Sequence, residues 1–281
     1  MNEQALRFDC EGDSLVGVLS APPSAGSRGV LIVVGGPQYR AGSHRQFTLL
    51  ARQLAQARIA SLRFDYRGMG DSSGTHRTFE HIDADIRCAL DQLFAAVPGL
   101  TDAVIWGLCD AASAALLYAH RDARVSGLAL VNPWVRTEQG MARTQLRHYY
   151  AGRLFQANLW RKMVSGELHL GRALAGLWQS FSAAARRERP ALGREASLPQ
   201  RMEDGLRRFR GRILLILSGN DLTAQEFRDL VAASAGWKSL LADRRVSRHA
   251  IAEATHTFSR REWRDEVARW TVAWIKETDR A

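Results

Sequence analysis

The chain has 281 residues, of which 46% are hydrophobic and 24% are charged, so it carries enough apolar material for one large core and is not a disordered protein. Its formal net charge is +10, and this whole excess lies within residues 134–212, which hold fifteen Arg and one Lys against six acidic residues. A charge confined to one segment argues against a nucleic-acid-binding domain, whose basic face usually lies on the core elements of the fold.

The N-terminal segment and the cysteines indicate the compartment. Residues 1–19 mix acidic and apolar residues and lack the basic and apolar regions of a signal peptide. The apolar stretches, such as residues 29–36, are too short to span a bilayer. Cys10, Cys88 and Cys109 are widely spaced and show neither metal-site nor disulfide spacing. We therefore expect a cytoplasmic protein with reduced thiols, no metal or other cofactor, and no stable membrane insertion.

Short β-type runs alternate with helical patterns in the first half of the chain, which is typical of a parallel sheet covered by helices. We expect strands at residues 15–19, 30–34, 60–64, 104–106 and 128–131. Apolar residues at helical spacing predict helices at residues 46–57 and 82–94.

The pattern changes after Pro133. Residues 135–210 contain no convincing strand but several helical stretches rich in Leu, Trp and Arg. Strands are expected again at residues 213–217 and 247–251, before a closing amphipathic helix. The sequence therefore predicts an α/β fold with a mostly parallel sheet flanked by helices, in which residues 1–133 and 211–281 form the core and residues 134–210 a helical insertion.

The sequence VIWGLCDAAS at residues 104–113 places an apolar strand, a sharp turn and an alanine-rich helix in succession. This is the pattern of a nucleophile elbow with Cys109 in place of serine. Gly107 and Ala111 supply the small neighbours that such a strained turn needs, and the N-terminus of a helix favours a thiolate. We therefore interpret Cys109 as a catalytic nucleophile; the alternative is a buried structural cysteine.

An acid and then a base should follow the nucleophile along the sequence. The sequence ILLILSGND at residues 213–221 is a buried strand that ends in a turn with Asp221, and EATHTF at residues 253–258 places His256 in a loop before the last helix. His256 would take the thiol proton, and Asp221 would fix its tautomer. Asp110 is an alternative carboxylate partner for His256.

The oxyanion hole should combine two backbone N–H groups. The first is that of Asp110, whose side chain we expect to cap the following helix. The second should come from the loop after the strand at residues 30–34, in which Pro37 has no N–H and Gln38 is the better candidate. Gly36 and Tyr39 of the same loop are candidate substrate-binding residues.

Four segments carry a resemblance to a known family: the GGP turn at residues 35–37, FDYRGMGDS at residues 64–72, GLCDAAS at residues 107–113 and THTF at residues 255–258. Together they resemble the α/β-hydrolases associated with the exosortase A system, type 1. The resemblance implies an α/β-hydrolase fold and a bacterial protein that works alongside exopolysaccharide production and the sorting of proteins with a PEP-CTERM tail.

Hydrolases of this fold commonly carry a cap at the position of the insertion. Trp160 and Trp178 are candidate pocket residues there, and the arginines of the insertion would suit an anionic group. The alternative is that the apolar side chains pack the cap helices and the arginines are solvated. The expected partner is a small-molecule or acyl-carrier substrate, with CoA, phosphopantetheine and anionic saccharides among the anionic candidates, and no nucleic acid.

The thiol leaves three functions open. An acyl-Cys109 intermediate can be hydrolysed, which gives an esterase or thioesterase, or it can pass to an alcohol or amine acceptor, which gives an acyltransferase. A non-catalytic binding protein is the third. We favour hydrolysis, because the fold and the family resemblance point that way.

Overall fold

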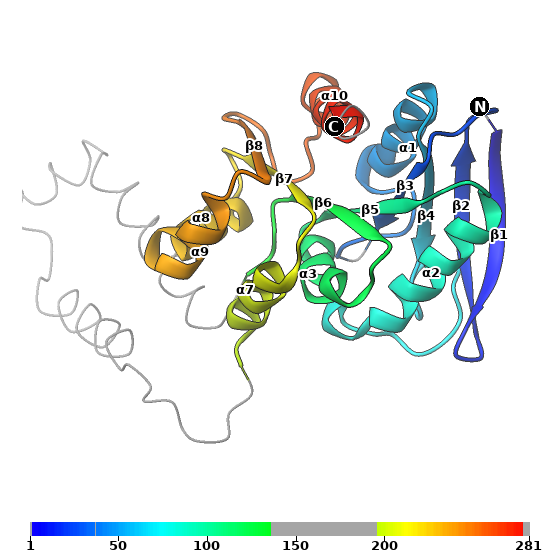
Figure 1. Ribbon diagram of the computed structural model, residues 1–281, viewed down its shortest axis with the longest axis horizontal. Helices are drawn as coiled ribbons and strands as arrows, with labels where there is room; N and C mark the ends of the chain where they lie inside the picture. The colour runs from blue at the N-terminus through cyan, green and yellow to red at the C-terminus, as the bar shows by residue number, and fades with distance from the viewer. Residues whose placement is uncertain (1, 37, 136–195, 278–281) are drawn as a thin grey trace, which may run out of the picture. The chain divides into compact units, whose positions relative to one another are not determined.

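The computed structural model describes residues 2–36, 38–135 and 196–277 (Figure 1). The protein divides into two compact units, Met1–Val135 with Pro199–Ala281, and Arg136–Leu198. The first unit contains the sheet. Nearly all of the second unit, including the predicted pocket residues Trp160 and Trp178, lies outside the described residues.

A single mixed sheet forms the centre of the first unit. In the described residues its strands run in the order β1-β2-β4-β3-β5-β6-β7-β8. β1 pairs antiparallel with β2, and β2 antiparallel with β4, whereas every pair from β4 to β8 is parallel. The strands are β1 (Asn2–Cys10), β2 (Asp13–Ala21), β3 (Arg28–Val33), β4 (Ala60–Asp65), β5 (Asp102–Leu108), β6 (Val125–Val131), β7 (Arg212–Ser218) and β8 (Val246–Ile251).

The predicted α/β class is confirmed, and helices flank both faces of the sheet. α1 and α10 lie together on one face, while α2, α3 and α7 lie on the other (Figure 1). The helices are α1 (Gln46–Gln56), α2 (Asp83–Ala96), α3 (Asp110–Tyr118), α7 (Leu198–Arg208), α8 (Leu222–Ala233), α9 (Ala235–Leu241) and α10 (Arg261–Glu277), and short 3-10 turns occur at Ser43–Arg45, Phe79–His81 and Ala119–Arg121.

The strand order places the site of interest. The polypeptide goes from β3 through α1 to β4 on one side, then returns through α2 to β5 on the other side of β3. Because crossovers between parallel strands are almost always right-handed, this reversal puts α1 and α2 on opposite faces of the sheet. The carboxyl ends of β3 and β5 therefore flank a topological switch point, which is where open α/β sheets bind their ligands.

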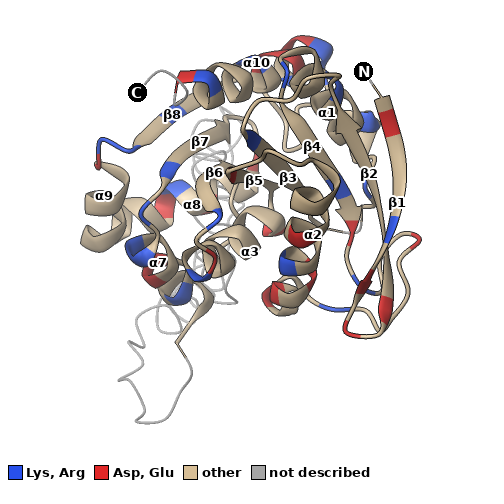
Figure 2. Ribbon diagram, turned by 45° about the vertical axis from the view of Figure 1, so that its right-hand side comes forward, with Lys and Arg blue, Asp and Glu red and all other residues tan. Residues whose placement is uncertain are grey.

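The central strands are buried on both faces. In each of β3, β5 and β7 the first residue is charged and the remaining residues are uncharged. β6 contains no charged residue (Figure 2). Alternate residues of β3 and β5 pack against α1 and α10, with Ile32 and Trp106 in the middle of this cluster. Continuous apolar runs of this kind are what a parallel sheet covered by helices requires.

Two elements differ from the sequence prediction. β1 was missed because most of its residues are exposed and only Phe8 and Cys10 are buried; it joins β2 through a two-residue turn in which Glu11 and Gly12 both have positive φ, as in type I′ hairpins. Residues 199–210, predicted as part of the insertion, belong to the first unit, because α7 buries Met202 and packs its Gly205 backbone against α3.

None of the helices in the described residues combines the length and the apolar character needed to cross a membrane.

Candidate active site

Cys109 lies in a tight turn between β5 and α3. Its backbone has φ 64° and ψ −126°, a conformation that is strained for any residue other than glycine. A Cβ atom at Gly107 would lie 2.6 Å from the backbone carbonyl carbon and oxygen of Ala111, so only glycine fits there. The half-buried thiol therefore sits where the backbone itself holds it, as the elbow pattern predicts.

Backbone hydrogen bonds fix this turn to the neighbouring strand. The N–H of Cys109 donates to the Val131 carbonyl at 2.9 Å, and the Cys109 carbonyl accepts from Ala112 N at 3.1 Å and from Trp134 N at 3.2 Å. These partners hold the residue on both sides of its peptide chain, which keeps the strained conformation in place.

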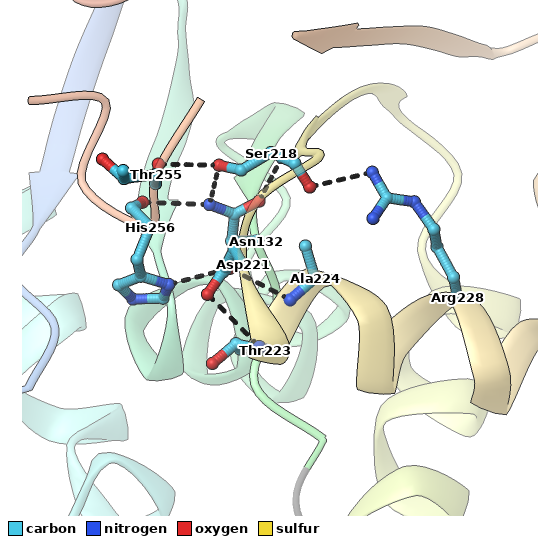
Figure 3. A network of polar contacts seen from close by, with 8 residues as sticks. All are labelled: Asn132, Ser218, Asp221, Thr223, Ala224, Arg228, Thr255 and His256. Carbon is cyan, nitrogen blue, oxygen red and sulfur yellow. Dashed lines mark hydrogen bonds and ion pairs between the residues drawn. The ribbon is translucent and has the colours of Figure 1, made fainter. Parts of the chain in front are cut away.

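Asp221 and His256 come together at the carboxyl ends of β7 and β8 (Figure 3). Oδ2 of Asp221 lies 2.9 Å from Nδ1 of His256. The same carboxylate caps α8 and accepts hydrogen bonds from Thr223 N at 3.3 Å and Ala224 N at 3.0 Å. Burial acts to raise the pKa of Asp221, but its hydrogen bond to His256, the charge of that ring and the two cap N–H groups outweigh burial and lower it. The acid is thus held in place by a helix end and is ionised.

His256 lies between the acid and the thiol. Burial acts to lower its pKa, but the hydrogen bond to Asp221, the hydrogen bond to Cys109 and the charges of both partners outweigh burial and raise the pKa to about 10. The ring is therefore an imidazolium at neutral pH. The arrangement therefore places a proton donor beside the sulfur of Cys109.

The carboxylate of Asp110 connects two segments. Its Oδ1 accepts a hydrogen bond from Gly36 N at 2.7 Å, and it also interacts with the N–H groups of Ala111 and Asp110 at the start of α3. Burial raises the pKa of Asp110, and backbone N–H groups of Gly36, Ala111 and Asp110 oppose this rise. The alternative in which Asp110 orients His256 is not supported, because Asp221 occupies Nδ1. Asp110 instead ties the loop after β3 to the elbow.

A buried carboxylate anchors the same loop from the other side. Asp65, at the end of β4, is fully buried, accepts from Arg40 N at 2.6 Å and from Asp71 N at 3.1 Å, and pairs with the Arg40 guanidinium. Gly70 must be glycine, because a Cβ there would lie 2.1 Å from Asp65 Oδ2. The turn at residues 65–72 therefore shapes the loop that carries Gln38.

Residues 30–270 match the profile of the alpha/beta hydrolase family. The chain belongs to this family. Esterase Pf2001 of Pyrococcus furiosus is similar in fold, with a TM-score of 0.67 at 15% identity over 98% of this chain and 91% of that one. Est1E of Butyrivibrio proteoclasticus gives 0.60 at 17% identity over 97% and 99% of the two chains, and DcsB in complex with its substrate analogue gives 0.63 at 14% identity over 98% and 99%. A comparison with curated proteins gives no match.

The remaining predicted residues of this hydrolase lie around the loop after β3. Gly36 has φ 63°, and a Cβ placed there would meet no atom within 4 Å. Oε1 of Gln38 accepts from Ser43 N at 3.0 Å, so this amide closes the loop on itself. Tyr39 is 54% exposed, with the Arg40 guanidinium 5.9 Å from its ring centroid. Within the described residues no cluster of three or more His, Cys, Asp or Glu is placed to hold a metal ion.

Two residues of the hydrolase site had no signal in the sequence. Asn132, just after β6, and Ser218, the last residue of β7, are both fully buried and form hydrogen bonds with each other and with the backbone around His256 (Figure 3). An Asn-Pro pair after a strand usually indicates a turn. Their contacts join segments that are 86 and 124 residues apart, which no local pattern reveals.

Proposed function

We propose that this protein hydrolyses ester or thioester bonds through an acyl-Cys109 intermediate. The observation that carries the proposal is the position of the His256 ring: its Nδ1 lies 2.9 Å from the Asp221 carboxylate, and Cys109 lies close enough to act on the pKa of the ring. A nucleophile, a base and an orienting acid in this relation are what covalent acyl transfer needs.

The first half of the reaction would form the acyl-enzyme. The Cys109 thiolate bonds to the acyl carbon, and the carbonyl electrons move to its oxygen, which the N–H groups of Asp110 and Gln38 would stabilise. When the tetrahedral intermediate collapses, the bond to the leaving alkoxide or thiolate breaks, and His256 gives that group its proton.

The second half would release the acid. His256, now neutral, takes a proton from water as the water oxygen bonds to the acyl carbon. The C–S bond then breaks, which restores the Cys109 thiolate and the His256 imidazolium. Asp221 keeps the ring in the tautomer that both steps use.

Intact-mass spectrometry tests the proposal. The protein is incubated with p-nitrophenyl esters and acyl-CoAs of increasing acyl length. We expect an acyl adduct on Cys109 that decays in water, and none in Cys109→Ala. An adduct that decays only when an alcohol or amine is added would identify an acyltransferase. Release of p-nitrophenol by Cys109→Ala at the wild-type rate would overturn the nucleophile assignment.

Cys88 offers a matched internal control, because its exposure falls in the same class as that of Cys109. Iodoacetamide should modify Cys109 faster than Cys88, and a bound acyl substrate should block only the former. Cys10 should react slowly, because it is buried and burial raises its pKa. Equal rates at Cys88 and Cys109 would mean that no activation is present.

We also propose the finer family placement and its setting: a type 1 hydrolase of the exosortase A system, acting in the cytoplasm on a small-molecule or acyl-carrier substrate. Its support is the run GLCDAAS at residues 107–113 together with the other three matching segments. Deletion of the gene in its bacterial host should reduce exopolysaccharide or impair sorting of PEP-CTERM proteins. A deletion strain with normal exopolysaccharide and sorting would contradict this placement.

A further inference from the structure

The segment that follows β6 contacts the nucleophile turn and the acid strand through its backbone. The Val131 carbonyl accepts from Cys109 N at 2.9 Å, and Trp134 N donates to the Cys109 carbonyl at 3.2 Å. Between these two residues, Asn132 N donates to the Ile216 carbonyl of β7 at 3.0 Å. Residues 131–134 thus join two of the three segments that carry the proposed catalytic groups.

The side chain of Asn132 reaches the third segment. Nδ2 donates to the His256 carbonyl at 3.0 Å and to Ser218 Oγ at 2.7 Å, while Oδ1 accepts from Ser218 N at 2.8 Å (Figure 3). The amide orientation follows from these partners, since the reverse would set an oxygen against a carbonyl and an N–H against an N–H. Asn132 is fully buried, so water cannot replace these bonds.

Ser218 extends the contact by one residue. Its Oγ donates to the Thr255 carbonyl at 3.0 Å, and its own carbonyl accepts from Arg228 at 2.9 Å. The carbonyls of Thr255 and His256 are therefore held by Ser218 and Asn132, respectively. Two consecutive fixed carbonyls set the direction of the Cα–Cβ bond of His256, from which the contact with Asp221 orients the ring.

We propose that Asn132 is a positioning residue, which together with Ser218 fixes the backbone of His256 so that the ring meets Asp221 and Cys109 at once. The expected effect on the reaction rate rests on the proposed function, whereas the expected effect on the position of the His256 ring does not. Loss of the amide would let the His256 loop shift, and a displacement of about 1 Å at a reacting group can lower a rate by roughly 100-fold.

The identity of residue 132 is explained by the same geometry. Its φ of 45° lies in the left-handed region, which asparagine adopts more readily than most residues. Aspartate would fit the space but would place an oxygen against the His256 carbonyl. Glycine would keep the backbone conformation and remove the amide.

The test compares Asn132→Asp, Asn132→Gly and Ser218→Ala with Ser126→Ala. Ser126 is the matched control. It lies near the start of β6, at the opposite end of that strand from Asn132, and its hydroxyl donates to Asp102 at the start of β5. Two readouts are needed: the titration of His256, followed by NMR of its ring protons, and kcat and KM for an activated ester. Asp221, Cys109 and Asp110 are the ionisable groups whose charges act on this ring.

We expect the Asn132 variants to lower the pKa of His256 from its wild-type value of about 10, and to lower kcat by roughly 100-fold with KM little changed. Ser218→Ala should show the same changes in smaller degree. Ser126→Ala should lower the melting temperature without changing the titration or kcat.

The proposal is overturned if the Asn132 and Ser218 variants lose thermal stability as Ser126→Ala does but keep the wild-type titration and kcat. If the Asn132 variants do not fold, Ser218→Ala decides alone, since it retains the amide. The titration is independent of turnover. A protein in which Cys109→Ala changes no activity would end the proposed function, while a shifted His256 titration would still support the positioning role.

Discussion

The nucleophile turn and the acid–base side of the site are held by different means. Cys109 is fixed by its own backbone: a strained φ of 64°, a glycine two residues before it and backbone hydrogen bonds to residues 131 and 134. His256 is held by side chains from other segments, namely Asp221, Asn132 and Ser218. The first region therefore depends on the absence of side-chain volume, and the second on the presence of specific polar atoms.

The two regions should therefore respond to different kinds of substitution. Added volume should damage the nucleophile turn and reduce stability, because protein interiors transmit strain. Removal of a polar atom on the acid–base side should reduce activity more than stability, because it changes where the ring lies. Four substitution or pH experiments test this contrast.

The largest effect should come from Cys109, the proposed nucleophile. Cys109→Ala should abolish turnover of an activated ester, and Cys109→Ser should retain little activity, because a hydroxyl is far less acidic than a thiol. Initial rates with a p-nitrophenyl ester measure this, and Cys88→Ala is the control that should keep the wild-type rate. An active Cys109→Ala enzyme would return Cys109 to a structural role.

The base should matter more than the acid that orients it. We expect His256→Ala to lower kcat by roughly 10⁴- to 10⁶-fold, and Asp221→Asn to have an effect smaller by about one to two orders of magnitude, since the base remains in place. Because Asp221 also caps α8, melting temperatures must be measured beside the kinetics. An Asp221→Asn enzyme slower than His256→Ala would contradict the assigned roles.

Gly107→Ala should break the nucleophile turn by volume alone. Its Cβ would lie 2.6 Å from backbone atoms of Ala111, so the turn must move, and we expect a loss of roughly 1–3 kcal/mol in the free energy of unfolding. Gly26→Ala is the control, since its Cβ would meet only the Arg58 carbonyl at 3.7 Å. Urea unfolding of both variants measures the difference, and equal stabilities would show that the turn is not tightly packed.

A pH dependence of stability tests the contact between His256 and Asp221. The pKa of His256 is raised from 6.5 to about 10, so its contribution to folding is fully present below pH 6.5 and is lost as the pH rises through 10. In Asp221→Asn, which lacks the main partner that raises this pKa, the loss should end at a lower pH. Unfolding free energies measured between pH 6 and pH 10 test the sign. Parallel curves for the two proteins would mean that Asp221 does not perturb His256.

Part of the site was predictable from sequence because its determinants are sequence neighbours. The run VIWGLCDAAS contains the strand, the small residues and the helix start that create the strained turn, so the sequence could place Cys109 in that turn. Asp221 and His256 could be proposed because each follows an apolar strand in the order that the nucleophile requires. The α/β class followed from the alternation of apolar strands with amphipathic helices.

Other features depended on contacts that no local pattern encodes. Asn132 reaches His256 across 124 residues, and Arg40 meets Asp65 across 25. The carboxylate of Asp110 accepts a hydrogen bond from Gly36, which lies 74 residues away. Helix α7 was assigned to the insertion by its composition, but its buried Met202 places it on the core.

The sequence by itself determined the class of the fold, the strained thiol and the order of the groups around it, because hydrophobic periodicity and turn sterics act over a few residues. The tertiary structure alone decided which polar atoms hold the base. A buried amide or hydroxyl takes whatever partner the packed strands bring within about 3 Å, and that partner is set by the strand order, in which β6 lies between β5 and β7.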